Sequence, residues 1–300
     1  MQGKEPIRVI YIMGMGRSGS TLLNIILGNH PEAESFGDLI DLTRYGWLNN
    51  ELCACGKSAN DCPFWSRVQH DWITQASISI VEYVALQNTF EHVRNLPRLC
   101  IEKVKQSPKY QLYAEHTLLL LNAIRAVSGK PFIVDASKTP GRAFALSLMP
   151  GIDLRVIHLV RDVRGVVFSK KKSSFPPVTP VWVSTVIWVL VNLLSTWVCR
   201  QLGSEKSMRV RYEDFADTPT RILNDIGSLS EIDLNDVAAA VSNGESMHIN
   251  HIIVGNRIRM ENSVCPLSAD REWMNKLSTK ERWIIRMLAG WLMHYYKYDW

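Results

Sequence analysis

The sequence predicts an α/β fold in which a doubly wound, mainly parallel sheet is flanked by helices. Two observations lead to this prediction. Short apolar runs rich in β-branched residues, typical of strands buried on both faces, recur along the chain, and helical stretches separate them. Strands that alternate with helices form parallel sheets. The 300 residues are 46% apolar and contain no internal repeat or low-complexity linker, so we expect a single domain over residues 1–300.

The expected strands lie at 7–13, 132–137, 154–160 and 208–212. The first of them, IRVIYIM, leads directly into a glycine-rich loop. In doubly wound sheets, ligands bind at the carboxyl ends of the strands. The segments of interest are therefore 14–21, 135–138 and 161–162.

Helices are expected at 20–27, about 110–127, about 163–172 and 182–202, and further helices begin at Pro219 and after Ser278, which forms a capping box with Glu281. The segment 181–198 has eighteen residues without a charge, close to the length of a membrane span. It also contains five Ser, Thr and Asn residues and lies between segments that we expect to share one ligand. We therefore interpret it as a buried core helix and expect no membrane span.

Charge and leader-sequence signals exclude several classes of protein. The net charge of +5 suits an anionic ligand, but the chain lacks the basic blocks of a nucleic-acid-binding arm, and we interpret the three lysines at 170–172 as a solvated helix face. The apolar run near the N-terminus is too short for a signal peptide. Six cysteines without a secretory signal indicate a reducing compartment. We expect a cytoplasmic protein that binds no nucleic acid, and no sequence feature indicates an oligomeric state.

Cys53, Cys55 and Cys62 lie close together in CACGKSANDCPFW. A zinc site would need a fourth ligand, and the spacing matches no common zinc knuckle. A zinc site and a disulfide are therefore less favoured than a tight turn with buried thiols, and no metal is expected.

The glycine-rich loop follows a strand and opens a helix, so its free N–H groups and the helix dipole predict an anion site. Gly14, Gly16 and Gly19 spell the G-x-G-x-x-G of a dinucleotide fold. That fold needs an acidic residue about twenty positions later, at the tip of a second strand. Glu34 and Asp38 lie at that distance, but the residues around them are typical of a turn, with no β-branched strand before the acid.

A P-loop nucleotide kinase is a second alternative. Thr21 would supply the hydroxyl for Mg²⁺, and Asp162 would end a Walker B strand. The position of the kinase lysine, however, is occupied by Ser20, and the cation of the loop stands earlier, at Arg17.

An adenosine 5′-phosphosulfate with a 3′-phosphate fits the sequence better than either alternative. It has a single 5′-phosphate and no polyphosphate–Mg²⁺ group, and it needs a separate cationic site for the 3′-phosphate. Arg161 at a strand tip and Ser169, eight residues later on the following helix, match that need. A guanidinium and a hydroxyl suit a phosphate monoester.

On these residues the chain resembles the sulfotransferases that use 3′-phosphoadenosine 5′-phosphosulfate (PAPS). The family's phosphosulfate loop is similar to GMGRSGSTLL, and its 3′-phosphate motif is an arginine and a serine eight apart. The most similar branch comprises bacterial-type soluble enzymes, whose further motifs occur here in the same order, from about residue 7 to beyond Trp273. They read here GDLIDL, CACGKSANDCPFW, VDASKTP, RYEDF and GNRIR. The resemblance implies a P-loop NTPase-like sulfotransferase fold.

The resemblance also implies roles for individual residues. Arg17 and the loop amides would hold the 5′-phosphate and the departing oxygen, and Lys138 would add positive charge near the sulfuryl group. The loop amides are those of Ser18, Gly19, Ser20 and Thr21. Arg161 and Ser169 would bind the 3′-phosphate. Tyr212 would pack on the adenine, and the segment of Gly255, Asn256 and Arg257 would close over the 3′-phosphate.

Asp38 is the leading candidate for the general base, although it is one methylene shorter than the family's usual glutamate. An alternative is that Asp38 caps a helix N-terminus. His116 and His30 are the runners-up for the base. Trp47 and residues 173–180 are candidates for the rim of the acceptor pocket.

The resemblance therefore implies a PAPS-dependent sulfotransferase of the EC 2.8.2 type, which releases 3′,5′-adenosine bisphosphate (PAP). The acceptor would be a hydroxyl or amine of a small molecule, natural product or carbohydrate, and the chemistry requires no metal. The P-loop nucleotide kinase and a non-catalytic nucleotide-binding module remain as alternatives.

Overall fold

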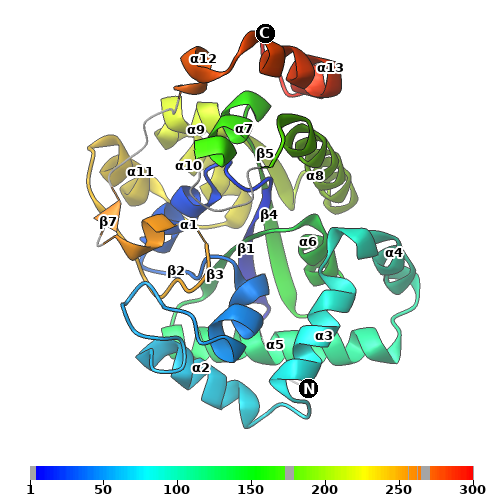
Figure 1. Cartoon of the computed structure of the whole chain (residues 1–300). Coiled ribbons are helices and arrows are strands. Elements are labelled where there is room, and N and C mark those ends of the chain that lie inside the picture. The colour runs from blue at the N-terminus through cyan, green and yellow to red at the C-terminus, as the bar shows by residue number, and fades with distance from the viewer. Residues whose placement is uncertain (1–4, 173–178, 256, 262, 265–270, 300) are drawn as a thin grey trace.

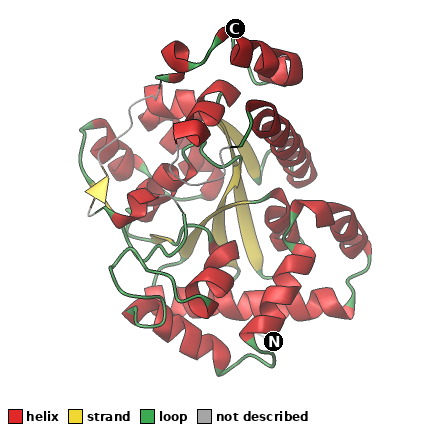
Figure 2. Cartoon of the chain, in the orientation of Figure 1, coloured by secondary structure: helices red, strands yellow, loops and turns green. Residues whose placement is uncertain are grey.

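The structure is a computed structural model that describes residues 5–172, 179–255, 257–261, 263–264 and 271–299. Within this part of the chain, five parallel strands form one sheet in the order β2-β3-β1-β4-β5. Their bounds are β1 Ile7–Gly14, β2 Ala33–Ser35, β3 Phe132–Lys138, β4 Ile152–Val160 and β5 Ser207–Arg211. β6 (Met247–His248) and β7 (Ser263–Val264) form a separate antiparallel pair. Helices lie on both faces of the large sheet, so the predicted α/β fold is confirmed (Figures 1 and 2).

The structure contains the helices predicted from the sequence, together with several others between them. Their bounds are α1 Ser20–Gly28, α2 Pro63–Ile73, α3 Ile80–Phe90, α4 Leu96–Val104, α5 Pro108–Ser128, α6 Pro140–Ser147, α7 Val163–Lys172, α8 Val181–Leu202, α9 Tyr212–Asp217, α10 Pro219–Ser230, α11 Asn235–Ser242, α12 Trp273–Lys276 and α13 Thr279–Tyr295. The short helical turns are η1 Leu39–Asp41, η2 Leu42–Leu48, η3 Val93–Asn95 and η4 Arg257–Met260. The capping box of α13 is present, because the Ser278 hydroxyl accepts from the Glu281 N–H and Glu281 accepts from the Ser278 N–H.

The central strand β1 is buried on both faces, which explains its continuous apolar sequence. Val9, Tyr11 and Met13 pack into the core on the side of α2, α5 and α6. Ile10 and Ile12 pack on the opposite side, with α1, α10 and α11. This alternation follows the two-residue period of a strand.

Strand β2 corrects one expectation from the sequence, which assigned this segment to a turn. Ala33, Glu34 and Ser35 pair with the first three residues of β3 at the edge of the sheet. None of these three residues is β-branched, so their local sequence does not favour a strand. Their hydrogen bonding to β3 determines their extended conformation.

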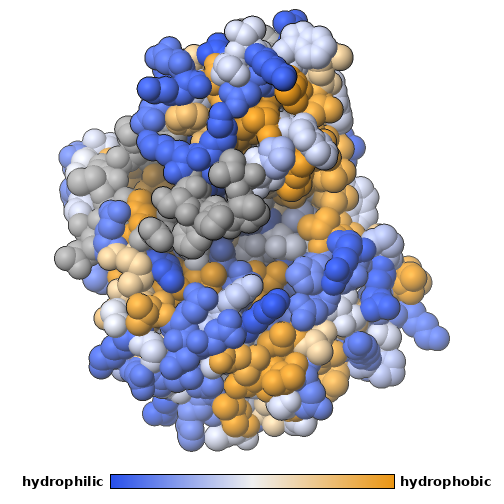
Figure 3. All heavy atoms as spheres, in the orientation of Figure 1, coloured by the Kyte–Doolittle hydropathy of each residue, from blue (hydrophilic) through white to orange (hydrophobic). Residues whose placement is uncertain are grey.

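Helix α8 forms where the sequence predicts a buried core helix, but much of its apolar surface is exposed. It packs against the sheet and α13, but only a third of its apolar window is buried. Its buried side is formed largely by small and polar residues, whereas Trp182, Ile187, Leu190 and Leu193 are exposed. Figure 3 shows hydrophobic residues gathered along the side of the molecule on which α8 lies. By length and composition alone α8 could cross a membrane; in this fold it covers the sheet instead.

Candidate active site

The register of the sheet brings three of the predicted segments together. Met13, just before the loop, lies opposite Lys138 at the end of β3, and Gly14 lies opposite Leu159 near the end of β4. Adjacent strands are about 4.8 Å apart. The glycine-rich loop is therefore flanked by Lys138 on one side and Arg161 on the other.

At two of the three loop glycines, the backbone conformation and close neighbours leave no room for a side chain. Gly14 has φ 145°, and a Cβ there would lie 2.3 Å from the Leu159 carbonyl oxygen. Gly19 has φ 92°, and its Cβ would lie 2.6 Å from the Tyr212 ring. A Cβ at Gly16 would meet no atom within 4 Å among the described residues. The loop therefore leaves open space beside Gly16, where a ligand can approach the backbone closely.

We expect Gly19→Ala to destabilise the protein by about 1–3 kcal/mol, because the left-handed backbone and the ring of Tyr212 both oppose a side chain. Gly16→Ala is the matched control and should leave the free energy of unfolding nearly unchanged. Chemical denaturation of both variants measures the difference. Equal stabilities would show that the loop relaxes around the new methyl group.

Among the described residues, no side chain caps the N-terminus of α1. Its N-cap residue, Gly19, makes no side-chain cap, and the first turn holds no acidic residue. The first N–H groups of such a helix have no partner within the helix, and the helix dipole favours negative charge there. The hydroxyl of Ser18 is also buried without a hydrogen-bond partner among the described residues.

Arg17, in the loop, and Lys170, on α7, lack an acidic partner within the described part of the chain. Burial lowers the pKa of the Lys170 ammonium, and the nearby charge of Arg17 lowers it further. Lys171 and Lys172 instead pair with Glu281 and Glu272. The lysine triplet is therefore not a uniform solvated face, because Lys170 is partly buried and, among the described residues, pairs with no acid.

Arg161 is buried where β4 ends. Its guanidinium donates to the carbonyl of Arg17 at 3.0 Å and lies 4.5 Å from the centre of the Tyr212 ring. The indole of Trp188, on α8, donates to the Arg161 carbonyl at 2.9 Å. The second predicted cationic site is thus fixed directly to the glycine-rich loop.

Ser169 and the segment of Gly255, Asn256 and Arg257 are also predicted to contact the donor. Ser169 lies half-buried in the last part of α7, the helix that starts just after Arg161. Gly255 is exposed, with φ 134°. Asn256 lies outside the described residues, and of Arg257 only the backbone, at the start of η4, is described. Their roles stay predictions.

Asp38 forms an ion pair with Lys138, one hundred residues later. Asp38 precedes η1 but makes no side-chain cap, so the alternative role as a helix cap is not supported. Burial raises the pKa of its carboxyl, while the charge and hydrogen bond of Lys138 oppose the rise. Lys138 itself has a left-handed backbone, φ 65°, as does Arg17, φ 75°. Such backbone strain in non-glycine residues is typical of functional sites.

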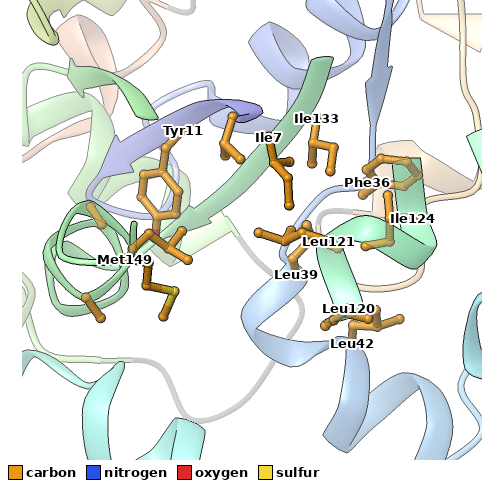
Figure 4. Close-up of a cluster of buried hydrophobic side chains, with 14 of the residues drawn as sticks. Ile7, Tyr11, Phe36, Leu39, Leu42, Leu120, Leu121, Ile124, Ile133 and Met149 are labelled. Atoms are coloured by element: carbon orange, nitrogen blue, oxygen red, sulfur yellow. The ribbon is translucent and has the colours of Figure 1, made fainter. Parts of the chain in front are cut away.

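A second carboxyl, Asp41, lies three residues from Asp38 and was not singled out by the sequence. Burial raises its pKa to about 6, and the negative charge of Asp38 adds to the rise. The side chains on either side of Asp41 in this segment anchor it, because Leu39 and Leu42 point into the core toward Leu120, Leu121 and Ile124 of α5 (Figure 4). The segment therefore holds two carboxyls against the end of β3.

A buried network of charges, centred on Arg142, supports the end of β3. Arg142, on α6, donates to Asp135 at 2.9 Å and pairs with Glu91. Asp135 also accepts hydrogen bonds from the backbone and hydroxyl of Ser137. The Ser137 hydroxyl in turn accepts from the Ile40 N–H at 2.9 Å. The network thus links β3 to the segment that carries Asp38.

The structure removes the two histidine candidates for the base. His116 is fully buried; its Nδ1 donates to the Leu112 carbonyl, and its Nε2 accepts from the Ser77 N–H. His30 follows the carboxyl end of α1, the opposite end from the loop, and accepts from the Glu32 N–H. Trp47 is buried in the core beside Trp72, so it does not form a pocket rim. Of the proposed Pro-rich rim, residues 173–178 lie outside the described residues.

Neither alternative reading of the loop is supported by the geometry. In dinucleotide folds the second strand lies beside the first, but here β3 separates β2 from β1, and Glu34 pairs with Lys130. A kinase would use Asp162 for Mg²⁺. Here the Asp162 carboxylate is bound by the guanidinium of Arg164, at 2.6 Å for the shortest contact.

Comparisons with known proteins agree with this geometry. A sequence profile of the sulfotransferase family matches residues 9–236. A search of curated proteins finds no match. The sulfotransferase domain of an olefin synthase from Synechococcus PCC 7002 is 18% identical with a TM-score of 0.55, and the match covers 100% of this chain and 98% of that one.

Two further solved structures share the fold. A sulfotransferase domain from the curacin biosynthetic pathway is 15% identical with a TM-score of 0.51, and the match covers 99% of each chain. A sulfotransferase of Mycobacterium avium is 11% identical with a TM-score of 0.50, over 98% of this chain and 78% of that one.

Proposed function

Because this chain belongs to the sulfotransferase family, we propose that it transfers the sulfuryl group of PAPS to a hydroxyl or amine of a small-molecule or carbohydrate acceptor. The observation that carries the proposal is the group of cations around one uncapped helix N-terminus. Arg17 lies in the loop without an acidic partner in the described residues, and Arg161 bonds to the loop's backbone. The charge of Arg17 also lowers the pKa of Lys170, on α7.

The donor would bind across the loop. Its 5′-phosphate would accept hydrogen bonds from the first N–H groups of α1, with Arg17 and Lys170 balancing its charge. The 3′-phosphate would lie against Arg161 and Ser169. This placement would direct the sulfuryl group toward Lys138, which lies on the other side of the loop.

In the proposed transfer step, the acceptor oxygen or nitrogen forms a bond to sulfur. The bond between sulfur and the 5′-phosphate oxygen breaks, and its electron pair stays on that oxygen, giving PAP. The acceptor proton moves to Asp38. Lys138 is already paired with Asp38, so base and cation would face the same reacting group, one removing the proton and the other stabilising the developing charge.

The experiment that tests the class of ligand is thermal denaturation with nucleotides. PAP should raise the melting temperature without Mg²⁺, whereas ATP and NAD should raise it much less. A Mg²⁺-dependent effect of ATP would instead favour a nucleotide kinase. A non-catalytic module would bind PAP but transfer no sulfuryl group to any acceptor and would not slowly hydrolyse PAPS.

Arg161→Ala should weaken PAPS binding about ten- to a hundredfold, because a charge-assisted contact contributes roughly 1.5–3 kcal/mol. Adenosine 5′-phosphosulfate, which lacks the 3′-phosphate, should bind nearly as before. Arg17→Ala should weaken both nucleotides. Isothermal titration of each variant with each nucleotide measures these effects.

Arg8→Ala is the control for the loss of one positive charge. Arg8 is exposed at the opposite end of β1, where its guanidinium lies over the Phe132 ring. It should change neither affinity. If Arg161→Ala weakened both nucleotides equally, Arg161 would support the loop rather than bind the 3′-phosphate.

A further inference from the structure

The three clustered cysteines meet a histidine from a distant part of the chain. The ligand atoms of Cys53, Cys55, Cys62 and His251 all lie within 4.8 Å of one another. His251 lies 189 residues after Cys62, in the segment between β6 and η4. The fold therefore supplies the fourth ligand that the sequence around the cysteines lacks.

The distances within this cluster match those of a tetrahedral metal site. Cys62 Sγ lies 3.6 Å from Cys55 Sγ, 3.7 Å from Cys53 Sγ and 3.2 Å from His251 Nδ1, and Cys53 Sγ lies 3.8 Å from the same nitrogen. With Zn–S about 2.3 Å and Zn–N about 2.0 Å, tetrahedral geometry separates two sulfurs by about 3.8 Å and a sulfur from a nitrogen by about 3.5 Å. Three thiolates and one imidazole are a common ligand set of structural zinc.

We propose that Cys53, Cys55, Cys62 and His251 bind a structural zinc ion. Cys53 and Cys62 are buried, whereas Cys55 is exposed and leaves a path for the metal to enter. All four coordination positions are taken by protein side chains, as in structural rather than catalytic zinc sites. The site thus adds a metal to the protein without giving it a part in the transfer reaction.

The residues after Cys62 hold the histidine in place. Pro63 begins α2, and the ring of Phe64 stacks on His251 with 5.2 Å between ring centres and 9° between planes. The indole of Trp65 donates to the His251 carbonyl at 2.6 Å. The CPFW sequence therefore supplies one ligand and orients another, which is the role of outer contacts at metal sites.

The loop of the first two cysteines has the tight backbone turn that such a site requires. The Cys53 N–H donates to the Lys57 carbonyl at 2.8 Å, and the Gly56 N–H donates to the Cys53 carbonyl at 2.9 Å. Gly56 has a left-handed backbone, φ 84°. The turn brings Cys53 and Cys55 to the same side, facing Cys62.

The zinc ion would fix a segment that borders the candidate active site. The Ala54 N–H donates to the Ile252 carbonyl at 2.8 Å, and Arg259 donates to the Ile253 carbonyl at 2.7 Å. Ile252 also lies so close to Gly37, next to Asp38, that a Cβ on this glycine would be 2.7 Å from it. The metal would thereby hold residues 251–255 against the segment of the proposed base.

Metal analysis of the purified protein tests the proposal directly. Protein purified without added metal should contain about one zinc ion per chain, and Cys62→Ser and His251→Ala should lower this to near zero. Cys199→Ser and His248→Ala are the matched controls, because neither residue belongs to the cluster, and both should keep the zinc. Cobalt substituted for zinc should show the strong visible absorption of a tetrahedral thiolate site.

A variant that fails to fold would lose zinc because its four ligands no longer come together. A second measurement is therefore needed. Cys55→Ser changes the exposed ligand and should fold while binding zinc more weakly in competition with a chelator. In the native protein, a chelator should lower the melting temperature, and added zinc should restore it. None of these readouts uses donor or acceptor, so they are independent of the proposed function.

Two results would overturn the proposal. Absence of zinc and cobalt binding in folded native protein would leave the cysteines as packed thiols. A mass two units lower per chain after denaturation without reductant would instead show a disulfide among them.

Discussion

Asp38→Asn should lower kcat by about 10²- to 10⁴-fold, the usual contribution of a general base. Asparagine keeps the size of the side chain and can still accept a hydrogen bond from Lys138, but it cannot take a proton from the acceptor. PAP binding should therefore change little. Single-turnover transfer from labelled PAPS, once an acceptor is identified by screening, measures the loss, and titration with PAP checks that the donor site is intact.

The activity of the native enzyme at low pH should depend on the pKa of the carboxyl that acts as the base. A general base works only when it is deprotonated, so activity falls as the pH drops below its pKa. Burial raises the pKa of both Asp38 and Asp41, that of Asp41 to about 6. We therefore expect kcat/KM to fall on the acid side at a pH above the ordinary pKa of an aspartate, about 4.

Asp41→Asn separates the two carboxyls. The pKa of Asp38 depends on its burial and on the charges of Lys138, Asp135 and Arg259 rather than on Asp41. If Asp38 is the base, Asp41→Asn should therefore leave both the acid limb and the maximal rate nearly unchanged. If instead Asp41→Asn abolished activity and Asp38→Asn did not, Asp41 would be the base. If neither change lowered kcat, proton removal would not limit the reaction.

Arg142→Met should destabilise the protein by about 3–5 kcal/mol, the usual effect of removing one partner from a buried ion pair. Arg142 is fully buried between Glu91 and Asp135, and methionine has a similar length but no charge. Two buried carboxylates would then face each other without a cation. Chemical denaturation measures the change in the free energy of unfolding.

Two further variants test this explanation. Arg155→Met removes a partly exposed arginine that pairs with Asp153 and Glu231 and should cost about 0–1 kcal/mol. Glu91→Gln added to Arg142→Met should recover part of the lost stability, because one of the unpaired charges disappears. A small effect of Arg142→Met by itself would mean that Glu91 and Asp135 take up protons at little cost.

The residues that sequence reasoning missed had weak local signals. Lys170 was hidden in a run of three lysines, and only the packing of α7 separates it from Lys171 and Lys172, which face acids of the C-terminal helices. Asp41 lies three residues from Asp38 in GDLIDL, and a search for paired carboxylates in this segment would have found it. Arg142 follows the VDASKTP motif, but nothing nearby indicates that its partners lie on β3 and next to α3.

The sequence by itself determined the alternation of strands and helices, the glycine-rich loop and the positions of Arg17, Arg161 and Ser169. These features depend on local rules, since apolar periodicity, turn residues and capping act within a few residues of each other. Only the tertiary structure decided that Asp38 pairs with Lys138, one hundred residues away, and that His251 joins three cysteines 189 or more residues earlier. Contacts over such distances depend on strand order and on the paths of connecting loops. Short-range propensities do not encode these, so the chemistry of the site became visible only when the chain was folded.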